Sequence, residues 1–259
     1  MTHDLPLIIA HRGSSAHAPE NTFAAFRKAI ADGADGIEFD VRLSRDGVPV
    51  IFHDEDLKRT AGRNERISDL PASELATIDI GSWFNRAFPR RARVEFSNET
   101  IKTFAETLEL LSGFPGRIYV ELKCTPGDAE PLSKAVCSLI CDSRLLPQII
   151  VKSFTLAAIP FVRQFCPASR TAALFEPTVA TVLNKQKNII DLAAHFGADE
   201  LSLHFSLATR RLTKMAARRN MPVTIWTVDK LRWLSKAEAM GIRALITNEP
   251  ELMLASRTT

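Results

Sequence analysis

The chain has 259 residues, of which 46% are hydrophobic and 24% are charged, as in an ordinary globular protein. There are 33 basic and 30 acidic residues, so the net charge of +3 argues neither for nor against an anionic substrate. No run of like charges resembles a nucleic-acid or membrane-surface patch, and we therefore expect neither nucleic acid nor a membrane as a stable partner.

The first residues, Met1–Gly13, enter an apolar strand at once and lack the features of a signal peptide. No apolar run approaches the length of a membrane span. None of the four cysteines stands in a CxxC pair, which favours free thiols in a reducing compartment. We therefore expect a cytoplasmic protein without membrane anchoring, and the sequence leaves its oligomeric state open.

Short apolar runs alternate along the chain with longer stretches of helical period. This alternation predicts a parallel sheet wrapped by helices, and a count of eight runs predicts an α/β fold of the TIM (β/α)8 barrel type. We expect one domain over residues 1–259. The predicted strands are Leu7–Ala10, Gly36–Val41, Arg117–Glu121, Ile149–Ser153, Thr171–Phe175, Glu200–Leu203, Val223–Trp226 and Ala244–Thr247.

Helices are predicted between these strands from their apolar spacing. The sequence Thr103-Phe-Ala-Glu106 has the form of a capping box at a helix start. The segment Val179–Lys187 is ambiguous. The predicted helices are Thr22–Ala31, Thr103–Ser112, Pro131–Cys141, Leu156–Phe165, Ile189–Phe196, Thr209–Arg219, Lys230–Met240 and Pro250–Ala255.

About sixty residues separate the second strand from the helix at Thr103. They hold a further apolar run, Val48–Phe52, and then a polar, turn-rich segment. A long excursion after a barrel strand is usually functional. We therefore expect a small inserted subdomain after the second strand, at about residues 54–99, that covers part of the barrel mouth.

Ionisable residues stand where successive apolar runs end. The first run ends in His11-Arg12-Gly13, the second carries Glu38 and Asp40, the run Val48–Phe52 ends in His53-Asp54, and the third barrel strand ends in Glu121-Leu122-Lys123. In such barrels the active site lies at the carboxyl ends of the strands. These residues are therefore predicted to meet at one site.

Glu38 and Asp40 are two residues apart on a strand, so their side chains share a face. If both face the barrel interior they repel each other unless a proton or a cation neutralises them. With Glu121 they form a set of oxygen ligands that suits Mg²⁺ or Ca²⁺; Mn²⁺ is compatible and Zn²⁺ less favoured. A structural network of ion pairs is the alternative.

Two histidines beside a metal suit acid–base chemistry on a phosphate ester. One of His11 and His53 would take a proton from the attacking hydroxyl, and the other would protonate the leaving alkoxide. Arg12 offers a planar fork for phosphate oxygens, and Lys123 offers a point charge.

These motifs resemble those of the glycerophosphodiester phosphodiesterases, which are TIM-barrel enzymes with a small inserted subdomain. The resemblance covers nearly the whole chain in order. The matching residues are His11-Arg12-Gly13, Pro19-Glu20-Asn21-Thr22, Gly36–Val41, Asp46-Gly47, His53-Asp54, Leu57, Arg59-Thr60, Gly81-Ser82-Trp83-Phe84, Glu121-Leu122-Lys123, Trp226-Thr227-Val228 and Ile246-Thr247.

The resemblance implies hydrolysis of glycerophosphodiesters to sn-glycerol 3-phosphate and an alcohol, with one divalent cation and a small-molecule substrate. It implies His11 and His53 as the acid–base pair and a cyclic phosphate or direct attack by water as the route. Other implied roles are metal binding by Glu38, Asp40 and Glu121, substrate binding by Arg12, Lys123 and Trp226, and support by Glu20 and Asn21, where Asn21 or Thr22 could instead cap the first helix.

Three positions depart from the family pattern. Asp229 stands where Asn is common, Asn248 where Asp is usual, and Lys102 where Pro often precedes the helix. Asp229 could cap the next helix, and Lys102 could lie near the mouth or in solvent. His17 and His204 are not motif positions, and we expect no role for them.

Two other functions remain open on the sequence. A related barrel phospholipase, of the phosphatidylinositol or sphingomyelinase D type, would use similar two-histidine chemistry. A binding or regulatory protein that lost turnover could keep the barrel, although both histidines and all three carboxylates are present.

Overall fold

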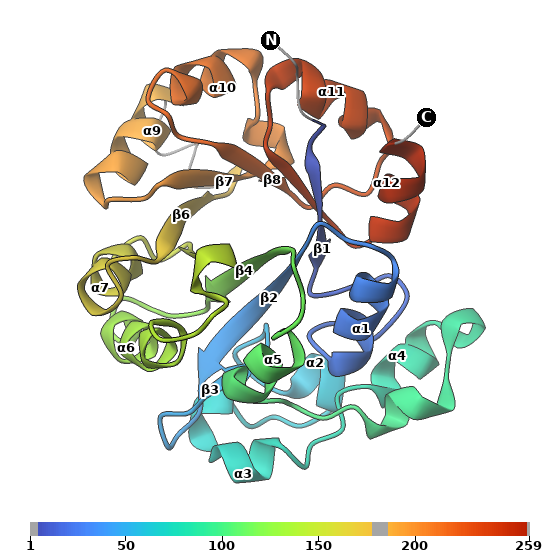
Figure 1. The fold of residues 1–259 in the computed structure, drawn as a ribbon. Helices are drawn as coiled ribbons and strands as arrows, with labels where there is room; N and C mark the ends of the chain where they lie inside the picture. Colours follow the sequence, from blue (N-terminus) through green and yellow to red (C-terminus); the bar gives the residue numbers. More distant parts are fainter. Residues whose placement is uncertain (1–4, 178–185, 258–259) are drawn as a thin grey trace.

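The computed structural model describes residues 5–177 and 186–257. Eight parallel strands close into a barrel, because β1 pairs with both β9 and β2, and the order then continues through β4 to β8. The predicted TIM barrel is thereby confirmed (Figure 1). Its strands are β1 (Leu7–His11), β2 (Gly36–Leu43), β4 (Arg117–Leu122), β5 (Ile149–Ser153), β6 (Arg170–Phe175), β7 (Glu200–His204), β8 (Val223–Trp226) and β9 (Ala244–Thr247).

Helices follow the strands and form the outer layer (Figure 1). Three begin at threonine caps: Thr22 accepts a hydrogen bond from Ala25, Thr103 forms the predicted capping box with Glu106, and Thr209 accepts from Leu212. Most of the ambiguous segment Val179–Lys187 lies outside the described residues. The helices are α1 (Phe23–Ala31), α5 (Phe104–Leu110), α6 (Ala129–Ile140), α7 (Ala158–Phe165), α9 (Gln186–His195), α10 (Arg210–Ala217), α11 (Arg232–Met240) and α12 (Pro250–Arg257).

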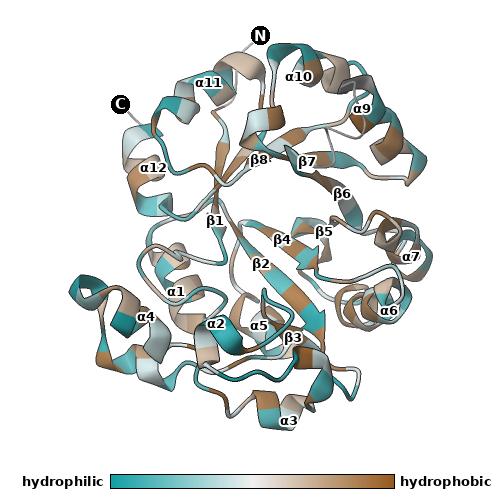
Figure 2. Ribbon diagram, turned by 180° about the vertical axis from the view of Figure 1, so that it is seen from behind, coloured by the Kyte–Doolittle hydropathy of each residue, from teal (hydrophilic) through white to brown (hydrophobic). Residues whose placement is uncertain are grey.

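Apolar side chains fill the space on both faces of the strands. Two large clusters pack between barrel and helices, and a smaller one lies inside the barrel around Ile9, Tyr119, Ile150 and Ile246. On β2, polar and apolar residues alternate, which Figure 2 shows as teal and brown bands along that strand. The polar residues of β2 therefore share one face of the strand.

The residues after β2 form a separate unit beside α1 and α5 (Figure 1). Strand β3 (Pro49–Ile51) runs antiparallel to the end of β2, and α2 (Lys58–Ala61), α3 (Ala72–Leu75) and α4 (Ser82–Ala87) follow with three 3-10 turns, Ile67–Asp69, Pro89–Arg91 and Val94–Asn98. The segment is more ordered than the expected polar, turn-rich excursion. It has its own apolar cluster of Val50, Phe52, Leu57, Ile67, Leu70, Leu75, Ile78, Ile80 and Ile101.

The four cysteines are free thiols, and two of them, Cys137 and Cys166, are buried. In the described parts of the chain, no helix combines the length and the apolarity needed to cross a membrane.

Candidate active site

Glu38, Asp40 and Glu121 lie together inside the barrel. Glu38 and Asp40 come from β2, and the register of β2 with β4 sets Asp40 beside Glu121. One carboxylate oxygen from each residue lies within 4.8 Å of the other two. All three residues are buried, and Glu38 is fully so. The structure therefore brings these three side chains together, as predicted.

Three basic side chains contact these carboxylates. The Lys123 ammonium touches Glu121 and lies 3.3 Å from Asp40 Oδ1. Arg12 Nε lies 3.1 Å from Asp40 Oδ2. Lys152 Nζ lies 2.9 Å from Glu38 Oε1 and 3.3 Å from Glu121 Oε2. The cluster is thus an ion-pair network, as the alternative interpretation expected, with groups that also suit a metal site.

Burial alone raises the pKa of a carboxyl group, since the charged form loses its water. At Glu38 burial is the largest single influence and raises the pKa, but the charges of Lys152 and His11 and a hydrogen bond from Lys152 together bring it below its usual value. At Asp40, Lys123 and then Arg12 outweigh burial and hold the pKa well below its usual value. Burial lowers the pKa of Lys152, but the carboxylates of Glu38 and Glu121 together raise it by more, so the net shift is upward. These side chains are therefore charged at neutral pH.

The chemistry of this donor set fits a divalent cation. All three ligand candidates offer carboxylate oxygens, which hard ions such as Mg²⁺ and Ca²⁺ prefer. Two of those oxygens, Glu38 Oε1 and Glu121 Oε1, are buried, and the ammonium groups of Lys152 and Lys123 are their basic neighbours. The residues present are thus compatible with an ion among them.

The loop after β1 is tied to the acidic strand β2. Arg12 and Asn21 adopt φ angles of 54° and 57°, in the left-handed region that non-glycine residues rarely occupy. The Arg12 N–H donates to Glu38 Oε2 at 3.1 Å, and the Asn21 amide donates to Asp40 Oδ2 at 2.9 Å. Backbone strain of this kind persists where surrounding contacts hold it, often at functional sites. Asn21 therefore supports Asp40, and Thr22 is the residue that caps α1.

Gly13 follows Arg12 with a φ of 80°. A Cβ at this position would lie 2.6 Å from the Ala25 carbonyl carbon. Glycine is therefore required both for the backbone conformation and for the close approach to α1.

Glu20 is held by two arginines beside the carboxylate cluster. Its carboxylate accepts hydrogen bonds from Arg12 at 2.7 Å and from Arg59 at 2.7 and 2.9 Å. Burial raises the pKa of Glu20, but Arg59 and Arg12 outweigh burial and the net shift is downward. Glu20 is thus a direct hydrogen-bond partner of Arg12, and the supporting role predicted for it stays a prediction.

His11 stands at the end of β1, with Nε2 3.9 Å from Glu38 Oε2. Its Nδ1 lies 2.7 Å from Asn248 Oδ1. An amide oxygen can only accept, so Nδ1 carries the hydrogen and Nε2 keeps its lone pair in the neutral ring. Burial is the main cause that lowers the pKa of His11 below 6.5, against the opposing charge of Glu38.

His53 follows β3 and has a different partner. Its Nδ1 lies 2.6 Å from Asp54 Oδ1, and Asp54 in turn accepts a hydrogen bond from Arg59 at 2.6 Å. Its ring also lies close enough to Asp40 to help lower the pKa of that carboxyl, after Lys123 and Arg12. His11 and His53 therefore both adjoin the carboxylate cluster, one with an amide partner and one with a carboxylate partner.

Two of the departures from the family pattern contact each other. The Asn248 side-chain amide donates to Asp229 Oδ2 at 2.8 Å, and the Asn248 backbone N–H donates to Asp229 Oδ1 at 2.8 Å. Asp229 also accepts from Thr247 at 3.0 Å. It does not cap the next helix, because α11 begins after Leu231 without a side-chain cap. Asp229 instead orients Asn248, the partner of His11.

Lys102 lies away from the carboxylates. Its ammonium donates to Thr100 at 3.0 Å and lies 5.6 Å from the centre of the Phe23 ring. His17 pairs with Glu249 at 2.7 Å.

Aromatic side chains stand beside the cluster. Trp226 packs edge-on against Phe154, with ring centres 5.4 Å apart, and against His204 at the same separation. The Lys123 ammonium lies 5.7 Å from the centre of the Phe154 ring. His204, for which no role was expected, thus contacts the predicted substrate-binding tryptophan.

Three residues that contact the candidate site were given no role from the sequence: Lys152, Phe154 and Arg59. Lys152 was detectable as a charged residue inside the β-branched run Ile149–Ser153. Phe154 was detectable as the residue that directly follows that run. Arg59 stood within a recognised motif, but its bridge between Asp54 and Glu20 depends on the fold of the insertion.

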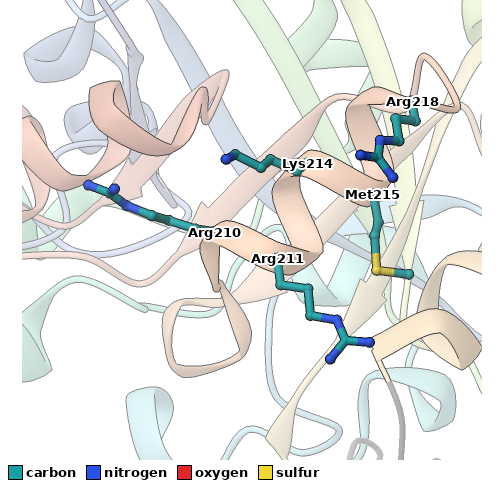
Figure 3. A pocket seen from close by; sticks show the side chains of 5 residues that line it. All are labelled: Arg210, Arg211, Lys214, Met215 and Arg218. Atoms are coloured by element: carbon teal, nitrogen blue, oxygen red, sulfur yellow. The ribbon is translucent and has the colours of Figure 1, made fainter.

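A groove of about 320 Å³ opens beside Lys123 and Phe154. It runs between the end of β4 and the insertion, with Glu55 and Ile67 on the far side. Another hollow, of about 550 Å³, lies on α10 and is lined by Arg210, Arg211, Lys214, Met215 and Arg218 (Figure 3). It contains none of the predicted site residues, whereas the groove beside Lys123 adjoins them.

Comparison with known proteins agrees with this arrangement. Residues 11–252 match the model of the glycerophosphoryl diester phosphodiesterase family. A glycerophosphodiester phosphodiesterase of Caldanaerobacter subterraneus is 29% identical over 252 residues, which cover 96% of each chain. One of Bacillus subtilis is 26% identical, over 97% of this chain and 86% of that protein.

Among solved structures, a phosphodiesterase of Oleispira antarctica in complex with the product sn-glycerol-3-phosphate is similar, with a TM-score of 0.85 and 27% identity over 98% of each chain. With a family match that spans almost the whole barrel, this chain belongs to the glycerophosphoryl diester phosphodiesterase family and is a phosphoric diester hydrolase.

Proposed function

We propose that this enzyme hydrolyses glycerophosphodiesters to sn-glycerol 3-phosphate and an alcohol in a reaction that depends on a divalent cation. The observation that carries the proposal is the cluster of Glu38, Asp40 and Glu121 within 4.8 Å, flanked by two histidines with unlike partners. The product complex of the similar Oleispira antarctica protein supports the same substrate class.

Glu38, Asp40 and Glu121 would hold the cation, for which Mg²⁺, Ca²⁺ and Mn²⁺ are the candidates. A divalent ion there would offset the negative charge that develops on the phosphoryl oxygens. Arg12 and Lys123 are 16% and 14% exposed at the mouth and would turn toward the phosphate. The planar fork of Arg12 suits two phosphate oxygens, with Glu20 holding it in orientation.

The two histidines divide the proton transfers. Neutral His11 presents its Nε2 lone pair, since Nδ1 is engaged by Asn248, and takes the proton of the attacking hydroxyl. Asp54 orients the ring of His53 through Nδ1, and His53 gives a proton to the oxygen of the leaving alcohol.

If the 2-hydroxyl of the glycerol attacks, its oxygen bonds to phosphorus while the bond to the alcohol oxygen breaks. The product is a cyclic phosphate. Water then opens the ring, with deprotonated His53 taking its proton and protonated His11 returning one. If water attacks first, the same two groups serve in a single step.

Trp226 would lie against the glycerol, with Phe154 beside it. The groove next to Lys123 would take the alcohol.

A panel of soluble glycerophosphodiesters, assayed with Mg²⁺, Ca²⁺ and Mn²⁺ after metal removal, tests the function. Release of sn-glycerol 3-phosphate is expected, with the preferred alcohol and metal given by the panel. Liposomes of intact phospholipid serve as the comparison substrate. Faster turnover of liposomes than of every soluble diester would contradict the proposed substrate and favour a phospholipase.

A further inference from the structure

Lys152 is buried inside the barrel. Its side chain is 2% exposed, and it stands two residues after Ile150, which packs with the inner apolar cluster. Residues two apart on a strand share a face, so Lys152 also faces inward. The register of β4 with β5 places it beside Glu121. A lysine at such a place requires charged partners, since an unpaired buried ammonium is costly.

The partners of Lys152 are two of the proposed metal ligands. Its ammonium lies 2.9 Å from Glu38 and 3.3 Å from Glu121. Lys123 contacts Glu121 as well, but it is 14% exposed against 2% for Lys152. Lys123 can therefore turn toward a substrate, whereas Lys152 is closed off within the barrel.

The charges of the cluster balance without an ion. Three carboxylates face three basic side chains, Arg12, Lys123 and Lys152. When a phosphate binds, Arg12 and Lys123 can turn from the carboxylates toward the phosphate oxygens. Lys152 has no such alternative, so a divalent ion held by Glu38 and Glu121 binds next to a positive charge that stays in place.

We propose that Lys152 is a positioning residue of the metal centre that holds Glu38 and Glu121 in their ligand arrangement before the ion binds and weakens the binding of that ion. The inference rests on the metal centre proposed above. Both effects have one origin, because the ammonium stabilises the metal-free cluster and repels the cation. Removal of the charge must therefore destabilise the metal-free protein more than the metal-bound protein, and must tighten metal binding.

The test uses Lys152→Gln and Lys152→Met, with Lys214→Gln on the exposed face of α10 as the control. Mn²⁺ binding is measured at pH 8 by electron paramagnetic resonance, and thermal melting is followed in EDTA and in saturating Mn²⁺. The dissociation constant for Mn²⁺ should fall at least about tenfold in both Lys152 variants, which corresponds to about 1.4 kcal/mol. The melting temperature in EDTA should fall by about 3–6 °C, and Mn²⁺ should recover most of this loss. The control should match the wild type in both.

A variant that folds only with Mn²⁺ would support the proposal, since the ion would then replace the missing charge. Unchanged or weaker Mn²⁺ binding in both variants, with normal binding by the wild type, would overturn the role of Lys152 alone. The same conclusion would follow if neither variant folded with or without Mn²⁺. A wild-type protein that binds no Mn²⁺ would contradict the metal centre itself and, with it, this inference.

Discussion

Replacement of Asn248 by alanine removes the 2.7 Å hydrogen bond between its Oδ1 and Nδ1 of His11. The His11 side chain is 17% exposed, so water has little room to replace the lost acceptor. A buried polar group left without a partner costs about 1–3 kcal/mol. If the reactive orientation of the His11 ring is destabilised by this amount, kcat/KM should decrease roughly 5- to 150-fold.

The assay is steady-state hydrolysis of a soluble glycerophosphodiester at saturating metal. The loss should lie in kcat, with KM changed little, because Asn248 contacts His11 and Asp229 rather than the substrate. Asn64→Ala, at an exposed position of the insertion, is the matched control. If Asn248→Ala were folded and kept kcat/KM within twofold of the wild type, the positioning of His11 by Asn248 would be refuted.

Exchanging the residues at positions 229 and 248 gives a second test of the same contact. Asn248→Asp alone places two carboxylates where the side chains now lie 2.8 Å apart, so they repel or share a proton. Asp229→Asn added to it restores a donor–acceptor pair. The double variant should therefore recover activity that Asn248→Asp loses, with the acid limb of its pH profile moved to higher pH by the new carboxylate beside His11. Purely additive losses would show that the two positions do not compensate each other.

Three further outcomes are expected. His53→Ala should lower kcat by about 10²–10⁴-fold, and Asp54→Asn by less, as measured by the same assay; an unimpaired His53→Ala enzyme would remove that residue from the chemistry. EDTA should abolish activity and Mg²⁺, Ca²⁺ or Mn²⁺ should restore it, whereas full activity in verified metal-free protein would contradict a metal requirement. The melting temperature of the metal-free protein should fall on acidification. The folded-state pKa of His11 lies below 6.5, and the pKa values of Glu38 and Asp40 are also lowered in the folded protein. The unfolded chain therefore binds more protons than the folded protein as the pH falls. The free energy of unfolding should decrease from about pH 6.5 downward and more steeply below about pH 4. A melting temperature that stays constant between pH 8 and pH 3 would contradict these shifts.

The barrel was predictable because each strand is a short run of apolar residues with a clear end. The eight predicted strands agree with the structure to within two residues at either end. The same feature predicted where the candidate site residues would gather, since the carboxyl ends of the strands in a closed parallel barrel lie at the mouth. Glu38 and Asp40 were predictable as a pair from their spacing alone, and the register with β4 then supplies Glu121.

Contacts between distant segments were not predictable. Asp229 and Asn248 each looked like an isolated departure, and only the pairing of the loops after β8 and β9 shows that they are partners. Lys152 looked like one more residue of a buried strand, because no local pattern tells which face of β5 points inward beside two carboxylates. Arg59 depended on the fold of the insertion, whose apolar cluster is built from single isoleucines and leucines spread over many residues.

The joint binding of a divalent ion by Glu38, Asp40 and Glu121 can be tested directly by anomalous diffraction from crystals grown with Mn²⁺. A single strong peak is expected among the three carboxylates, and it should disappear in crystals of Glu121→Gln grown under the same conditions. A peak elsewhere, or none at the Mn²⁺ concentration that supports activity, would show that the cluster is an ion-pair network and not the metal centre.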